Sequence, residues 1–221
     1  MTQTKLVFSP SEALVGYLEQ LYSQHAAAPQ KVHTDAMRGI VEHFIDEVNQ
    51  AFFLAPIEAI EAEGSVVNII LKGVGVIRKT GRSLALRLLD RITTKDQAGL
   101  VAHFKRLHFQ HEGQHYVGFS FAPEVQAQVT AAFAKVHENE EVPIDSLVEA
   151  FQQIADAALY HYMDSTMEAI EVKAFSRGLI RAARATIKKS TSVAINRGIP
   201  ALGTHYRRGL VKYFEDHFIN L

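Results

Sequence analysis

The fold of this chain is indicated first by residues Ser65–Ile92, which read SVVNIILKGVGVIRKTGRSLALRLLDRI. Apolar side chains recur in this stretch at steps of three and four, and this spacing places them along one stripe of a helix. In its first half the opposite face is apolar as well, with Val66, Ile69 and Val76. A helix that is apolar on two faces is usually packed on both sides. We therefore expect Ser65–Ile92 to be the central helix of a helical protein.

Most of the remaining chain shows the same helical period, with one exception between residues 107 and 121. There, Leu107–Gln110 and His115–Phe121 alternate like strands, and the turn between them contains Gly113, where a positive φ would be needed. The sequence predicts a mainly α fold, a multi-helix bundle of about seven or eight helices with one small β-hairpin near residues 107–121.

Length and composition limit the domain organisation and the chemistry of the chain. It has 221 residues, of which 48% are hydrophobic, and it has no cysteine. We expect one α-helical domain over residues 1–221, with a candidate sub-boundary at the linker-like residues 137–143. Disulfides, thiolate metal sites and cysteine nucleophiles are excluded. Because no stretch is apolar enough for a signal peptide or a membrane span, we expect a cytoplasmic protein without a transmembrane segment.

Charge is sorted along the second half of the chain. Nine carboxylates and no lysine or arginine lie between Val136 and Val172, whereas ten basic residues and no acidic one lie from Lys173 to Phe214. Within the basic part, Arg177, Arg181, Arg184 and Lys188 are spaced four, three and four apart and form one ridge along a helix. A ridge of like charges repels itself, so something should compensate it.

Two interpretations of the ridge are open. The acidic segment just upstream can fold back and pair with it, or the ridge can bind an anionic partner, because the arginine side chain suits phosphate. For the second interpretation, nucleic acid is slightly favoured over a lipid headgroup, and the basic flank of Ser65–Ile92 should converge with the ridge. The candidate anion-binding residues are Arg177, Arg181, Arg184, Lys188, Arg207, Arg208, Arg78 and Arg82.

The segment His111-Glu112-Gly113-Gln114-His115 matches H-E-x-x-H and so resembles the zinc-binding motif of metallopeptidases. That resemblance implies His111 and His115 as metal ligands and Glu112 as the general base. The motif works on a helix, whereas these surroundings read as strand, turn and strand. We therefore expect no cofactor and keep zinc on His111 and His115 as an alternative.

These observations favour a non-enzymatic α-helical binding protein that engages an anionic partner through its C-terminal basic ridge. One alternative is a zinc-dependent hydrolase that uses the HEGQH segment. Another is a structural homo-oligomer without a small-molecule ligand, whose oppositely charged surfaces pair across subunits.

Overall fold

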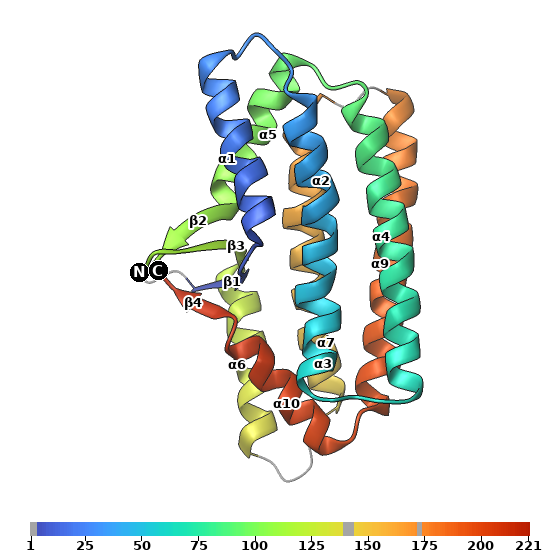
Figure 1. Ribbon diagram of the computed structural model, residues 1–221. Coiled ribbons are helices and arrows are strands. Elements are labelled where there is room, and N and C mark those ends of the chain that lie inside the picture. Colours follow the sequence, from blue (N-terminus) through green and yellow to red (C-terminus); the bar gives the residue numbers. More distant parts are fainter. Residues whose placement is uncertain (1–3, 139–143, 172–173) are drawn as a thin grey trace.

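The computed structural model describes residues 4–138, 144–171 and 174–221, and within them the protein is the predicted mainly α multi-helix bundle with a small antiparallel sheet (Figure 1). The α-helices are α1 (Glu12–Ala27), α2 (Thr34–Asn49), α3 (Ala55–Ala59), α4 (Ser65–Leu89), α5 (Thr94–Leu107), α6 (Pro123–Glu138), α7 (Ile144–Leu159), α8 (Ser165–Glu168), α9 (Ala174–Ala201) and α10 (Thr204–Glu215). The strands are β1 (Thr4–Phe8), β2 (His108–His111), β3 (Gln114–Ser120) and β4 (Phe218–Asn220).

The predicted hairpin is present as β2 and β3. The two turn residues, Glu112 and Gly113, have φ values of 50° and 79°. Positive φ at both central residues is the geometry of a two-residue turn whose twist matches that of the strands. The hairpin is part of a larger sheet, because the strand order is β2-β3-β1-β4.

The two outer elements of the chain, β1 and β4, complete this sheet and were not predicted from the sequence. β1 pairs antiparallel with β3, with Leu6 opposite Phe119, and with β4, with Lys5 opposite Ile219. The described ends of the chain consequently lie close together at one edge of the molecule (Figure 1). A hairpin alone is marginally stable in water, and β1 provides the support that it needs.

Two of the helical rods contain a π-helical turn. α2 continues through η1 (Gln50–Leu54) into α3, and α7 continues through η2 (Tyr160–Asp164) into α8. Pro56 explains the first of these turns, because proline lacks an N–H group and its ring displaces the carbonyl one turn earlier. The N–H of Ala55 accordingly donates to the carbonyl of Gln50, five residues back.

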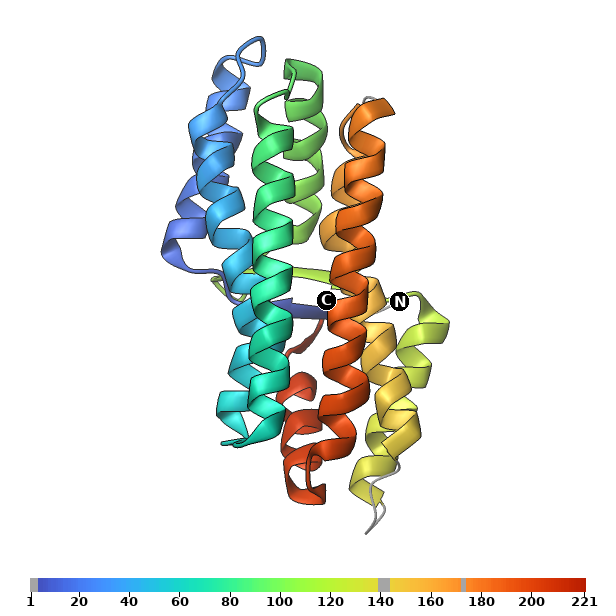
Figure 2. The ribbon, with the colours of Figure 1, turned by 90° about the vertical axis from the view of Figure 1, so that its right-hand side faces the viewer.

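The expectation of a central helix at Ser65–Ile92 requires a correction. α4 lies at the outside of the bundle, antiparallel and side by side with α9 (Figures 1 and 2). On its outer side, Leu71 is 50% exposed and Val76 is 40% exposed. Gly73 faces α9 closely, since a Cβ atom at this position would lie 3.7 Å from the Cβ of Ala194. The apolar residues of α4 thus cover only one side of a core, and the second apolar face is partly open to solvent.

The last turn of α9 contains a proline, because the helix continues to Ala201 with Pro200 inside it. The candidate sub-boundary at 137–143 lies mostly outside the described residues. None of the helices in the described ranges has the length and apolarity that crossing a bilayer demands.

Candidate functional site

The pair formed by α4 and α9 concentrates positive charge on one side of the molecule. Neither helix contains an aspartate or a glutamate. Because the two helices pack side by side, the basic residues of α4 and of the C-terminal ridge belong to the same two-helix layer. Together the two helices carry eleven basic residues: Lys72, Arg78, Lys79, Arg82, Arg87, Arg177, Arg181, Arg184, Lys188, Lys189 and Arg197.

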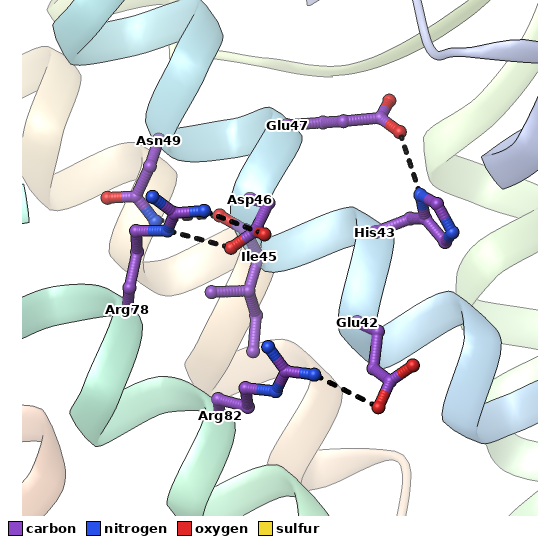
Figure 3. A network of polar contacts seen from close by, with 8 residues as sticks. All are labelled: Glu42, His43, Ile45, Asp46, Glu47, Asn49, Arg78 and Arg82. Carbon is purple, nitrogen blue, oxygen red and sulfur yellow. Dashed lines mark hydrogen bonds and ion pairs between the residues drawn. The ribbon is translucent and has the colours of Figure 1, made fainter.

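Along the α2 side of this layer, two arginines of α4 are paired with carboxylates (Figure 3). Arg78 Nη2 lies 2.7 Å from Asp46 Oδ2, and Arg82 Nη2 lies 3.0 Å from Glu42 Oε1. The hydrogen bond that Arg78 donates lowers the pKa of the Asp46 carboxyl group. These contacts attach α4 to α2, so Arg78 and Arg82 serve the packing of the layer.

Along the α7 side, two members of the C-terminal ridge are paired in the same way. Arg184 Nη2 lies 2.8 Å from Asp164 Oδ2 in η2, and Lys188 Nζ lies 2.9 Å from Asp156 Oδ1 in α7. Both carboxylates belong to the acidic segment upstream of the ridge. These two ion pairs are of the kind that the first interpretation of the ridge describes, in which the upstream acidic segment folds back and pairs with it.

The remaining seven cations of the layer are all exposed, and within the described residues none of their side chains has an ion pair or a hydrogen bond. Three exposed apolar side chains, Leu71, Val76 and Val193, lie on the same two helices. We call the exposed surface of α4 and α9 that carries these residues the basic face. Its cations are Lys72, Lys79, Arg87, Arg177, Arg181, Lys189 and Arg197.

The residues of the basic face therefore differ from the candidate anion-binding residues predicted from the sequence. Arg177 and Arg181 belong to the basic face, whereas the other five members of the basic face were not selected from the sequence. The sequence feature that could have identified them is the lack of aspartate and glutamate over the full length of both helices. A net charge of −1 for the whole chain conceals this local excess.

Arg207 has a structural role. It is only 9% exposed, and its guanidinium donates hydrogen bonds to the carbonyl oxygens of Ile199 and Pro200. These carbonyls lie in the last turn of α9, where backbone acceptors lack partners within the helix. Arg207 therefore closes the end of α9 and does not reach the basic face, whereas its neighbour Arg208 is exposed on α10.

The HEGQH segment forms a turn between two strands, so the helix on which a zinc motif depends is absent there. His111 lies opposite Gln114 in the ladder, one residue before His115. Successive side chains point to opposite faces of a strand, which directs His111 and His115 to different sides of the hairpin. His115 instead pairs with His108, whose Nε2 lies 2.8 Å from His115 Nδ1. Among the described residues no group of three or more histidine or acidic side chains is placed to hold a metal ion.

Comparisons of this chain with family models, with curated proteins and with solved structures gave no match.

Proposed function

We propose that the protein is an interaction protein that binds a linear polyanion, with nucleic acid as the first candidate, across the basic face of α4 and α9. The observation that carries this proposal is the convergence of two helices without acidic residues, which leaves seven cations exposed and without an anionic partner in the described chain. Phosphate groups of a bound partner would compensate this charge, as lysine and arginine contacts do in nucleic-acid complexes.

The dimensions of the basic face favour an extended partner over a single phosphate group. On α9, exposed cations occur from Arg177 to Arg197, along about 30 Å of helix. Lys72 and Arg87 span about 22 Å of α4 beside it. A surface about 30 Å long matches about nine base pairs of a duplex. Two packed helices present a broad face, so backbone contacts without base readout are expected.

The first prediction concerns removal of charge from this face. Changing Lys72, Lys79 and Lys189 to Gln should weaken binding to a labelled duplex of about 20 base pairs, because each lysine that contacts a phosphate releases a counterion. The slope of log K against log salt should be about −4 to −6 for the unmodified protein and less steep by about 3 for the variant. Fluorescence anisotropy over a salt series measures both slopes.

The matched control removes the same charge elsewhere. Lys31, Lys105 and Lys212 are exposed residues outside the basic face, and their change to Gln should leave the slope unchanged. Equal effects of the two triple variants would contradict the proposal, as would a lack of binding to duplex, single strand and heparin at low salt. Binding to anionic vesicles but to no nucleic acid would show that the basic face binds a membrane surface instead. Light scattering on the same samples would reveal self-association.

A second prediction uses the ion pairs at the α7 side. Changing Asp156 and Asp164 to Asn removes the partners of Lys188 and Arg184, so these two cations become available to phosphate. Polyanion affinity should rise, and the salt slope should become steeper by about 2. The control changes Asp145 to Asn and Glu149 to Gln, which are exposed on the same helix. A similar rise in the control would show that only net charge matters.

A further inference from the structure

An apolar chamber of about 270 Å³ lies within the bundle, directly beneath the layer of α4 and α9. Its walls come from the rods α2–η1–α3 and α7–η2–α8, from α4 and α9, and from the last turns of α5 and α10 at Phe104 and Phe214. Protein interiors are close-packed and contain few voids larger than a water molecule. A chamber of this size is therefore a feature that the packing of the chain leaves open, as ligand sites between helices of bundles do.

The chamber is elongated and has no charged side chain among the described residues that line it. On α4 its wall extends from Val66 to Leu84, which corresponds to about 27 Å of helix. Small residues such as Gly81, Ala155 and Ala158 leave room along its length. A carboxylate, phosphate or ammonium group inside the chamber would lose its hydration and would find no opposite charge there, which is unfavourable.

Both π-helical turns contribute to this chamber. η1 supplies Phe52 and Phe53, and η2 supplies Tyr162 and Met163. The rings of Phe52 and Tyr162 face each other across the rods, with centroids 6.1 Å apart. Turns of this kind are rare inside α-helices and occur frequently at functional sites. Pro56 accounts for η1, and together the two turns place four large side chains on opposite walls of the same space.

The wall also contains polar atoms that the described chain leaves without a hydrogen bond. Asn49 is only 1% exposed, and its amide group donates to the carbonyl of Ile45, which identifies the other atom as Oδ1. That oxygen and the hydroxyl group of Tyr162 have no partner. Burial raises the pKa of Tyr162, which keeps this hydroxyl protonated. Unsatisfied buried polar atoms are exceptions in native proteins and call for an explanation.

We propose that this chamber binds an uncharged, elongated apolar molecule, namely a hydrocarbon chain that carries at most a hydroxyl-type polar group. The length and apolar character of the wall select a hydrocarbon chain, and the lack of charge excludes an ionised head inside the chamber. A hydroxyl group on the guest would offer a partner to Asn49 or Tyr162 after a small rearrangement of the side chain. This site is distinct from the basic face and does not depend on the function proposed for it.

The test uses 1-decanol and sodium decanoate as probes of equal chain length on the full chain at about pH 8, where the carboxylate is ionised. Isothermal titration calorimetry should give one decanol per chain with a negative heat-capacity change, which marks burial of apolar surface. Decanoate should bind at least about tenfold more weakly. No saturable decanol binding would overturn the proposal, and equal or tighter binding of decanoate would overturn the uncharged class.

A pair of variants locates the binding in the chamber. Ala158→Phe places a ring in the chamber and should reduce decanol affinity at least about tenfold. Ala131→Phe adds the same ring on the exposed side of α6 and should have no effect. If Ala158→Phe fails to fold, Ala155→Leu takes its place in the test, because it puts a smaller side chain into the same chamber. Decanol binding that persists in a folded, filled variant would show that the chamber is not the site.

Discussion

Replacing Gly99 with alanine should lower the free energy of unfolding by about 3 kcal/mol or more. Gly99 lies in α5, and a Cβ atom at this position would lie 1.9 Å from the backbone oxygen of Ala169, at the end of α8. A backbone carbonyl cannot rotate away as the end of a side chain can. Accommodation of the methyl group therefore requires α5 and the end of α8 to separate.

That separation would also break a specific polar contact between the two segments. The N–H of Glu171 donates to Asp96 Oδ1 over 2.6 Å, and the other oxygen of Asp96 caps α5 through Thr93. Asp96 is buried, so an unmatched carboxylate there is costly. The loss outweighs the gain of up to about 1 kcal/mol that alanine usually brings in a helix interior.

Gly75→Ala in α4 is the matched control. No atom lies within 4 Å of a Cβ atom at Gly75, so this change should raise the free energy of unfolding by about 0.5–1 kcal/mol. Urea denaturation of the two variants and the unmodified protein measures both effects. Similar stabilities of the Gly99 and Gly75 variants would contradict the close contact between α5 and α8.

Helix content and the hairpin could be predicted from the sequence, because both depend on local patterns. The apolar period of α4 and the strand pattern around Gly113 are read within a few residues of each other. The placement of α4 could not be predicted in this way. Its apolar residues resemble those of a helix that is buried on both sides, yet Leu71 and Val76 are exposed, because α4 lies at the edge of the bundle.

The terminal strands illustrate a different limit. β1 and β4 have five and three residues, and each is defined by a partner far along the chain. Leu6 pairs with Phe119, and this approach requires Gly118, where a Cβ atom would lie 2.5 Å from the oxygen of Leu6. Gly118 looks like an interruption of a strand in the sequence, whereas in the structure it permits the pairing of β3 with β1.

The candidate site was only partly predictable for the same reason. The repulsion along the ridge could be inferred from spacing, but the partners of Arg184 and Lys188 became known only once α7 and η2 were placed against α9. No feature of the sequence indicated the chamber. Phe52 and Ala158 have the character of ordinary core residues, and a wall around an open space has the same composition as a filled core.

Protonation of His103 should make the stability of this protein depend strongly on pH below neutrality. His103 in α5 is 1% exposed, and its pKa is lowered to about 4 by burial and by the nearby charge of Arg106. Its neutral form fits its contacts. Thr166 donates its hydroxyl to the Tyr162 carbonyl, which leaves its oxygen to accept from His103 Nε2 over 3.0 Å, while Nδ1 accepts from Arg106 over 3.2 Å.

The direction of the effect follows from proton binding. Between about pH 6.5 and pH 4 the unfolded chain binds a proton at His103 and the folded chain does not. The free energy of unfolding is therefore fully retained above about pH 6.5 and decreases as the pH falls toward 4, by up to about 1.4 kcal/mol per pH unit and about 3 kcal/mol in total. Burial also lowers the pKa values of His108 and His161, which adds to this loss.

Changing His103 to Gln separates its contribution from the others. Glutamine keeps a donor for Thr166 but does not titrate, so the variant should be less stable at pH 7.5 and should show a shallower decrease between pH 6.5 and 4.5, by about 1 kcal/mol per pH unit. Urea denaturation over this range gives the slopes, and NMR titration of the imidazole gives the pKa. The lowered carboxyl pKa of Asp96 acts in a separate window, below about pH 4, and does not obscure the comparison. An unchanged slope in the variant, or an imidazole that titrates near 6.5, would contradict the burial of a neutral histidine between α5 and α8.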